Sequence, residues 1–264
     1  MLKTFREGMD FGGKTVAVLG GAGLLGSAVV EGLSAFNAHS LIVDVDSKKG
    51  KALKERISKE GGNADFHLAD CSKFEEVPKI IKEIEATHGQ ISGWSLCFYP
   101  RTNDWNNKLE DIPLKSWNTN VDQHMNAVCL FSSEIARRMS QRGGGSIVTI
   151  GSIYGLVAPN FKNYEGTDMT SPAAYSAIKG GIIAFSKYLA SYYGSRNVRV
   201  NSVIPGGIFN DQPKSFIRNY SSQTCLGRLA QPEEVASAII YLLSDASSYI
   251  TGVSLPVDGG YLAL

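Results

Sequence analysis

Short runs of apolar residues alternate along this chain with longer segments whose apolar positions recur at helical spacing. The short runs are rich in Val, Ile and Leu and are apolar on both faces, as strands covered by helices on each side must be. We predict strands at residues 14–19, 40–45, 64–68, 91–99, 146–150, 198–204 and 253–257. We predict helices at residues 26–36, 48–60, 73–87, 117–139, 173–193 and 232–244.

Strands that alternate with amphipathic helices are typical of βαβ units and a parallel sheet. We therefore expect an α/β protein: one doubly wound Rossmann domain over residues 1–264, with a parallel sheet of about seven strands and helices on both faces. The length of 264 residues suits one large domain. Residues 153–172 form a long irregular stretch, which is typical of a lid or binding segment, and we expect an inserted substrate loop there.

Composition narrows the possible partners. The chain has 26 basic and 25 acidic residues and a net charge of +1, so neither a nucleic acid nor a membrane surface is expected as a partner. The four cysteines (Cys71, Cys97, Cys129 and Cys225) show neither a CxxC pair nor metal-ligand spacing, so we expect no metal and no disulfide framework. Residues 1–14 lack the apolar core of a signal peptide, and no run of about 18 apolar residues could span a bilayer. The expected location is the cytoplasm.

A glycine-rich turn, GGAGLLG at residues 20–26, separates the first predicted strand from the first predicted helix. Glycines in this position let the backbone approach a pyrophosphate, which then rests on the helix N-terminus. The expected cofactor-binding residues of the turn are Gly20, Gly21, Gly23, Leu24 and Leu25. The glycine pattern alone also fits an ordinary turn.

An acidic residue, Asp44, ends the second predicted strand, 18 residues after Gly26. A carboxylate there would bind the ribose hydroxyls of an adenosine and repel a 2′-phosphate, so we predict NAD rather than NADP as the cofactor. The alternative is a solvated strand end. Asp70 and Cys71 close the third strand, where such folds hold the adenine, although a plain turn aspartate explains Asp70 equally well.

Three residues form the predicted reaction centre. Tyr175 and Lys179 lie four residues apart on one face of a predicted helix. An ammonium beside a phenol lowers the pKa of the phenol, so we expect Tyr175 to exchange a proton with an alcohol oxygen near neutral pH. Ser152 follows the fifth strand at the carboxyl edge of the sheet, and its hydroxyl could bind the reacting carbonyl oxygen. Each feature alone is common, but their combination favours catalysis.

These residues together resemble the classical short-chain dehydrogenase/reductase family from about residue 12 to residue 264. The resemblance rests on the glycine turn, Asp44, GSIVTIGS at 145–152, YSAIK at 175–179, VRVNSVIPG at 198–206, and YITG and VDGG between 249 and 260. It implies that Pro205, Gly206 and Ile208 border the nicotinamide. It also implies a homotetramer or homodimer built partly through the long helices and the C-terminus.

Three features depart from the family pattern. Leu19 and Leu24 replace a Thr and a Gly of the usual turn, which gives the GxxGxxG spacing of the extended branch, although the chain closes in the classical manner. The usual Asn-Asn-Ala-Gly after the fourth strand reads LCFY at 96–99. His124 stands where the family has an Asn that connects the catalytic Lys to water. His124 could relay protons through a ring nitrogen, or it could be purely structural.

A finer resemblance concerns the substrate. Ser152 and Tyr175 are 23 residues apart, and the intervening segment, together with YPR at 99–101 and PGGIF at 205–209, is similar to the flagellin-modification protein A subgroup. That subgroup belongs to gene sets for unusual sugars on surface glycans, which implies a sugar phosphate or nucleotide sugar as substrate. Arg101, with Lys162 as a weaker candidate, is predicted to bind its anionic group. The alternatives are a reductase of acyl, steroid or polyol carbonyls, or a non-catalytic NAD-binding protein.

Overall fold

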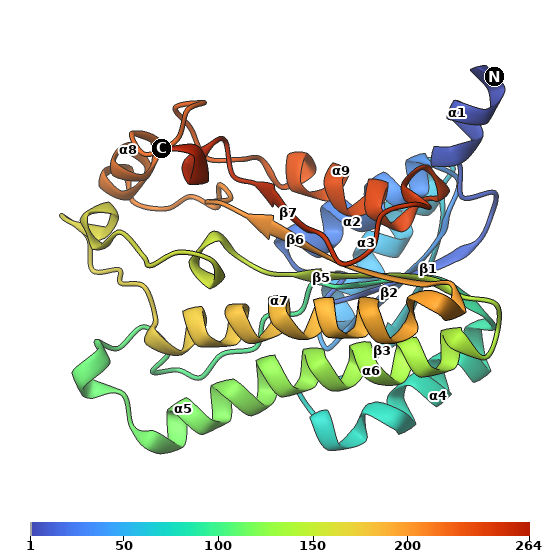
Figure 1. The fold of residues 1–264 in the computed structure, drawn as a ribbon, viewed down its shortest axis with the longest axis horizontal. Helices are drawn as coiled ribbons and strands as arrows, with labels where there is room; N and C mark the ends of the chain where they lie inside the picture. The colour runs from blue at the N-terminus through green and yellow to red at the C-terminus, as the bar shows by residue number, and fades with distance from the viewer. Residues whose placement is uncertain (1) are drawn as a thin grey trace.

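Seven strands form one fully parallel sheet in the computed structural model, which describes residues 2–264 and the side chains from Arg6 onward (Figure 1). The strand order is β3-β2-β1-β4-β5-β6-β7. The strands are β1 (Thr15–Leu19), β2 (His39–Asp44), β3 (Asn63–Leu68), β4 (Ile91–Leu96), β5 (Gly145–Ile150), β6 (Val198–Pro205) and β7 (Ser254–Val257). The predicted α/β class and parallel sheet are confirmed.

Helices cover both faces of this sheet (Figure 1). One layer consists of α2 (Leu24–Ala35), α3 (Ser47–Lys59) and α9 (Pro232–Leu243), and the other of α4 (Val77–His88), α6 (Ala127–Ser140) and α7 (Ala173–Tyr193). Ile147 and Val148 are successive residues of β5, both fully buried, and they pack into opposite layers. This two-sided burial explains why the strands are apolar at consecutive positions.

The order of the strands determines where a ligand can bind. The chain runs from β1 outward to β2 and β3, and then returns to the other side of β1 with β4. At such a switch point the connections leave the sheet in opposite directions and open a crevice at the carboxyl edge. The segment after β5, α8 (Lys214–Ser221) and the C-terminus gather at this end of the molecule (Figure 1).

Several elements differ from the sequence-based prediction. The single helix predicted at residues 117–139 is three segments: α5 (Leu114–Asn120), a π-helical turn (Val121–Asn126) and α6. β4 ends at Leu96 rather than at residue 99. The short helices α1 (Leu2–Met9) and α8 were not predicted, because eight residues give too few periodic positions to identify. Among the described helices, none is long and apolar enough to cross a membrane.

Residues 153–172 form an ordered wall that is attached to α8. The Asn219 side-chain amide donates hydrogen bonds to the carbonyl oxygens of Lys162 (3.3 Å) and Glu165 (3.1 Å). The Ser215 hydroxyl donates to the carbonyl oxygen of Gly166 (3.0 Å). These bonds join the long segment after β5 to a helix about 50 residues later in the chain.

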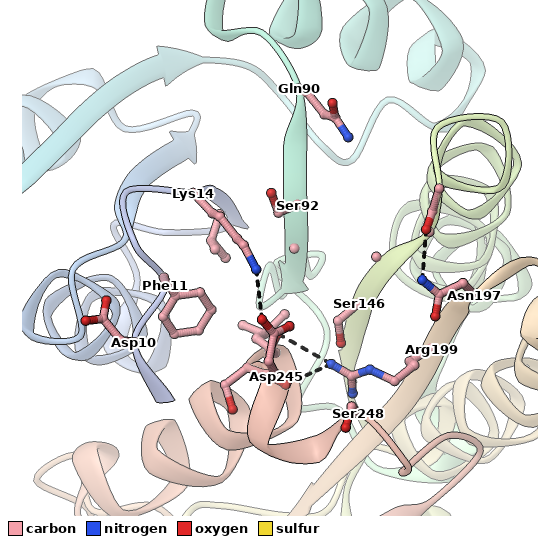
Figure 2. A pocket seen from close by; sticks show the side chains of 17 residues that line it. Asp10, Phe11, Lys14, Gln90, Ser92, Ser146, Asn197, Arg199, Asp245 and Ser248 are labelled. Atoms are coloured by element: carbon pink, nitrogen blue, oxygen red, sulfur yellow. Dashed lines mark hydrogen bonds and ion pairs between the residues drawn. The ribbon is translucent and has the colours of Figure 1, made fainter. Parts of the chain in front are cut away.

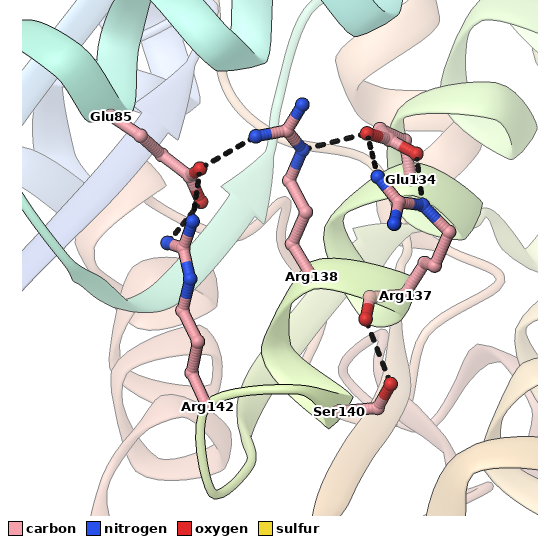
Figure 3. Close-up of polar contacts among 6 residues, drawn as sticks. All are labelled: Glu85, Glu134, Arg137, Arg138, Ser140 and Arg142. Carbon is pink, nitrogen blue, oxygen red and sulfur yellow. Dashed lines mark hydrogen bonds and ion pairs between the residues drawn. The ribbon is translucent and has the colours of Figure 1, made fainter.

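A group of ion pairs connects α4 to α6 in the helical layer that these two helices form with α7 (Figure 3). The Arg138 guanidinium lies between the carboxylates of Glu85 on α4 (2.8 Å) and Glu134 on α6 (2.6 Å). Arg142 also pairs with Glu85, and Arg137 pairs with Glu134. Arg138 is therefore the link between the two helices.

Candidate active site

A pocket of about 930 Å³ opens at the carboxyl edge of the sheet. It is lined by the ends of β1, β2, β4, β5 and β6 and by residues from α7, α8 and the 153–172 segment. The predicted site residues that line it are Gly20, Gly23, Leu24, Leu25, Asp44, Asp70, Cys71, Arg101, Ser152, Tyr175, Lys179, Pro205, Gly206 and Ile208. Gly21, His124 and Lys162 do not line it.

The glycine turn lies beneath the N-terminus of α2. A Cβ added to Gly26 would lie 2.1 Å from the carbonyl oxygen of Gly20, so only glycine lets the helix pack this closely against the turn. No side chain caps α2 at Gly23, which leaves the amide groups of its first turn available to an anion. The residues present therefore fit the pyrophosphate of a dinucleotide.

The Asp44 carboxylate accepts two backbone hydrogen bonds, from the amides of Ala22 (2.9 Å) and Asp46 (2.9 Å). These bonds hold the carboxylate at the end of β2 with its side chain on the pocket. Among the described residues that line the pocket, the basic side chains are Arg101 and Lys179, which come from the segment after β4 and from α7. The Asp44 end of the pocket therefore presents negative charge.

Asp70 and Cys71 lie beside Asp44 on the same rim. The Asp70 carboxylate accepts hydrogen bonds from the amide (3.0 Å) and hydroxyl (2.7 Å) of Ser72, which is a local turn interaction. Burial raises the pKa of the Cys71 thiol, so this residue behaves as a small apolar side chain. Their location suits an adenine contact, and the turn geometry also accounts for Asp70.

Ser152, Tyr175 and Lys179 meet at the centre of the pocket. The hydroxyl groups of Tyr175 and Ser152 lie near each other, and the Ser152 oxygen accepts a hydrogen bond from the amide of Tyr154 (3.2 Å). The Lys179 ammonium group donates to the carbonyl oxygen of Ile150 (2.8 Å) and lies 5.6 Å from the centroid of the Tyr175 ring. The end of β5 and the first turns of α7 thus bring the three side chains together.

The expectation that Lys179 lowers the pKa of Tyr175 is wrong for this structure. Burial raises the pKa of the Tyr175 phenol above its usual value, and the nearby Ser152 hydroxyl offsets this only in part. Burial also lowers the pKa of Lys179 to about 7. Desolvation disfavours the charged form of each group, and the Lys179 nitrogen is directed at a carbonyl oxygen rather than at the phenol.

His124 lies below the pocket, in the π-helical turn between α5 and α6. Its side chain is buried, and Nε2 lies 3.4 Å from the Lys179 nitrogen. Burial and the nearby Lys179 hold the pKa of His124 well below its usual value, so the ring is neutral. Nδ1 has no hydrogen-bond partner among the described residues. The structure places His124 beside Lys179, and both a relay and a structural role remain compatible with this geometry.

The two candidate anion-binding residues are in different environments. The Arg101 guanidinium lines the pocket, lies 5.3 Å from the centroid of the Tyr99 ring, and forms no ion pair within the described chain. Lys162 is exposed on the 3₁₀ turn Phe161–Tyr164, outside the pocket. The structure therefore supports the position predicted for Arg101 and does not bring Lys162 to the site.

An aromatic wall around Tyr175 was not foreseen from the sequence. Its members are Tyr99, Trp105, Tyr154, Tyr164, Phe216 and Tyr220. Tyr99 and Trp105 pack edge-on against Tyr175, with ring centroids 5.9 and 6.3 Å away. The one available signal was the number of aromatic residues in the irregular segments that follow β4 and β5, and it did not extend to Phe216 and Tyr220, which lie on α8.

A second hollow, of about 320 Å³, lies at the opposite, amino edge of the sheet (Figure 2). Its charged side chains already have partners. The Arg199 guanidinium donates to the carbonyl oxygens of Leu242 (2.8 Å) and Ser244 (3.0 Å), and Lys14 pairs with Asp245 (2.8 Å). The hydrogen bonds around this hollow connect β6 to the end of α9 and the segment that follows it.

Comparison with known proteins agrees with this geometry. The family model described as Enoyl-(Acyl carrier protein) reductase matches residues 21–262. Post-translational flagellin modification protein A of Campylobacter coli is 27% identical over 250 residues, which cover 94% of this chain and 98% of the relative. The 3-oxoacyl-(acyl-carrier-protein) reductase FabG of Chlamydia muridarum is 32% identical over 253 residues, covering 94% of this chain and 96% of the relative.

A solved structure extends the comparison to three dimensions. The crystal structure of a short chain dehydrogenase from Leptospira borgpetersenii serovar Hardjo-bovis with bound NAD+ matches with a TM-score of 0.83 and 30% sequence identity. The match covers 99% of this chain and 96% of that structure. The family model, the relatives and the fold agree over nearly the whole chain. The chain therefore belongs to the short-chain dehydrogenase/reductase family and is an NAD(P)-dependent oxidoreductase.

Proposed function

We propose that this enzyme uses NAD and transfers a hydride to or from a sugar-derived alcohol or ketone that carries an anionic group, such as a sugar phosphate or nucleotide sugar. The observation that carries the proposal is Arg101, whose guanidinium lies on the wall of the pocket that contains Tyr175 and has no ion-pair partner among the described residues. A guanidinium is suited to bidentate binding of a phosphate or carboxylate. The likeness to a flagellin modification protein supports a substrate from surface-glycan biosynthesis.

Each residue of the site has its own role in the proposed reaction. The nicotinamide, when bound, supplies or accepts the hydride. Tyr175 passes a proton to or from the substrate oxygen, and Ser152 holds that oxygen by a hydrogen bond. Lys179 binds the nicotinamide ribose and exchanges the proton onward, with His124 as its neighbour at 3.4 Å. Pro205, Gly206 and Ile208, which line the pocket, would border the nicotinamide, and the members of the 153–172 segment that line the pocket would contact the substrate.

The preference for NAD rests on Asp44. We expect NAD(H) to bind more than about tenfold tighter than NADP(H), or about 1.4 kcal/mol, because a 2′-phosphate would meet this carboxylate. Fluorescence titration of both cofactors measures the ratio. Asp44→Ala should narrow it, whereas Asp46→Ala, which removes a neighbouring carboxylate outside the pocket lining, should not. Equal affinities for the two cofactors in the wild-type enzyme would rule out the assignment.

The anionic substrate is tested by a panel of sugar phosphates and nucleotide sugars, followed through the absorbance of the reduced cofactor. Arg101→Ala should raise KM for the best anionic substrate by an amount worth about 1.5–3 kcal/mol, the range for hydrogen bonds to charged groups, and leave NADH affinity unchanged. Lys162→Ala is the matched control, since Lys162 lies outside the pocket. A preference for uncharged substrates would contradict the proposal.

A second candidate function is the reduction of an acyl or other apolar carbonyl. It is favoured by the apolar part of the wall, which includes Ile153, Met169 and Phe216. The FabG relative of Chlamydia muridarum supports it as well. A 3-oxoacyl thioester in the same panel distinguishes the two functions: turnover of the thioester, with an Arg101→Ala variant that is fully active, would favour this second function.

We also propose that the enzyme is a homo-oligomer, a dimer or a tetramer, formed through α6 and α7. The outer face of these helices exposes Leu130, Tyr188 and Tyr192. Phe185, Tyr188 and Tyr192 form a continuous stack along α7, with ring centroids 5.8 and 6.0 Å apart. An exposed stripe of large aromatic residues is typical of a protein–protein contact.

A further inference from the structure

Tyr99 is a second phenol beside the proposed proton carrier Tyr175. Tyr99 follows β4 at the carboxyl edge of the sheet. Its ring lies edge-on to the Tyr175 ring, with the ring centroids 5.9 Å apart. Although its ring is packed on several sides, 40% of the residue surface is exposed, and the side chain lines the pocket. Tyr99 is therefore within reach of a small molecule that contacts Tyr175.

The orientation of the Tyr99 hydroxyl is set by Trp105. The buried Trp105 indole N–H donates a hydrogen bond to the Tyr99 oxygen (2.9 Å). Because the oxygen is the acceptor in this bond, the hydroxyl proton must point away from the indole. In the described part of the chain, the one hydrogen bond of the Tyr99 hydroxyl is this bond from Trp105. Tyr99 thus offers the pocket a hydroxyl donor that is already oriented.

The ring itself is held in place by its neighbours. His124 lies edge-on to it, with centroids 5.2 Å apart, and the Arg101 guanidinium lies 5.3 Å from its centroid. The Lys179 nitrogen is 5.8 Å from the same centroid. A side chain fixed on these sides loses little further conformational entropy when it binds a ligand, which favours recognition over simple filling of space.

The pocket lining contains another hydroxyl group that has no hydrogen-bond partner among the described residues. Ser171, at the end of the 153–172 segment, is buried and lines the pocket. Its hydroxyl lies near the Tyr164 hydroxyl but forms no hydrogen bond of acceptable geometry. An unsatisfied buried hydroxyl costs free energy unless a ligand or water completes it. Tyr99 and Ser171 thus both line the pocket that contains Tyr175, and each has a hydroxyl group available to a ligand.

We propose that Tyr99 is a substrate-binding residue whose hydroxyl donates to an oxygen on a carbon adjacent to the reacting carbon. The enzyme accordingly selects vicinal diols in oxidation and α-hydroxy ketones in reduction. This inference rests on the proposed function only in taking Tyr175 as the residue that contacts the reacting oxygen. It does not depend on an anionic group or on a sugar skeleton.

The test compares cis-1,2-cyclohexanediol with cyclohexanol, which differ by one neighbouring hydroxyl. With NAD present, kcat/KM is measured from reduced-cofactor absorbance, and dissociation constants are measured from intrinsic tryptophan fluorescence. We expect the wild-type enzyme to favour the diol by up to about tenfold, the upper range for one neutral hydrogen bond. Tyr99→Phe should bring the diol-to-alcohol ratio close to one.

Two further variants separate recognition from packing. Trp105→Phe keeps the Tyr99 hydroxyl but frees its orientation, so the ratio should fall only in part. Tyr249→Phe removes a hydroxyl from a fully exposed residue and should leave the ratio at the wild-type value. A melting temperature for each variant reports any loss of stability, because Tyr99→Phe leaves the Trp105 indole without its acceptor.

The inference is overturned if the wild-type enzyme shows no diol preference in either turnover or binding. It is equally overturned if Tyr99→Phe keeps the preference, or lowers turnover of both alcohols by the same factor. Failure of the proposed function looks different: no sugar phosphate or nucleotide sugar is turned over, while the diol preference and its dependence on Tyr99 persist.

Discussion

Burial acts in opposite directions on the two ionisable groups at the reaction centre. It raises the pKa of the Tyr175 phenol and lowers the pKa of Lys179 to about 7. Each shift favours the uncharged form, because a charge loses its hydration in the pocket. At neutral pH the phenol is protonated, as a group that donates a proton to a carbonyl oxygen must be, and Lys179 is close to its titration midpoint.

Replacement of Tyr175 by Phe tests its role directly. The ring and its packing remain, so the variant should bind NADH as the wild-type enzyme does. Turnover should fall by about 10²–10⁴-fold, the range for loss of a general acid or base. Fluorescence titration and steady-state kinetics measure the two quantities. Normal turnover in Tyr175→Phe would refute the proposed role of this phenol.

The buried Lys179 should also leave a signature in stability. Its pKa is about 7 in the folded protein and about 10.5 in the unfolded chain, so the unfolded chain binds more protons between these values. The free energy of unfolding should therefore rise with pH in this window, by up to about 1.4 kcal/mol per pH unit from this group. Urea unfolding of wild type and Lys179→Met at several pH values isolates the contribution, and parallel curves would contradict it.

Individual elements show what the sequence could and could not predict. Runs of apolar residues predicted the strands. The expected end of β5 and the expected start of α7 predicted that Ser152, Tyr175 and Lys179 lie near each other. The π-helical turn Val121–Asn126 was not predictable, because one wider turn leaves the apolar spacing of a long helix almost intact. The positions of Tyr99 and Trp105 depend on an irregular segment, where no periodic pattern fixes the direction of a side chain.

The link between α4 and α6 provides a prediction about these helices. Arg138→Ala removes bonds to both Glu85 and Glu134 and leaves two largely buried carboxylates with fewer partners (Figure 3). We expect a loss of about 1–3 kcal/mol in the free energy of unfolding, measured with urea. Arg137→Ala is the control: Arg137 is half-exposed and pairs only with Glu134, so the loss should be below about 1 kcal/mol. Equal losses would show that Arg138 does not join the helices.

At the scale of the whole molecule, the carboxyl and amino edges of the sheet differ in structure. The carboxyl edge holds the large pocket, and the amino edge holds the smaller hollow, where Arg199 donates hydrogen bonds to backbone carbonyl oxygens. The exposed side chains of Leu130 on α6 and of Tyr188 and Tyr192 on α7 are not among the residues that line the large pocket. Copies of the chain could therefore associate through the face that exposes them without blocking the pocket.

Light scattering after size-exclusion chromatography tests that association. The wild-type protein should have the mass of a dimer or tetramer. The double variant Tyr188→Glu, Tyr192→Glu should have a smaller mass, because it places charges in an apolar contact. Tyr249→Glu, at a fully exposed residue, should keep the wild-type mass. A monomeric wild-type protein, or an unchanged mass in the double variant, would contradict the proposed interface.

The strand order leaves β3 and β7 with one unpaired side each. β7 has four residues and includes Pro256, which has no N–H to offer to an incoming strand. β3 has Asp65, whose carboxylate is held by Lys54 (2.6 Å) and His39 (3.1 Å). Short, proline-containing or charged outer strands resist the edge-to-edge pairing with other chains that leads to amyloid-like aggregates. We expect that concentrated preparations of the folded enzyme stay free of fibrils, and that Pro256→Val would make them more prone to form.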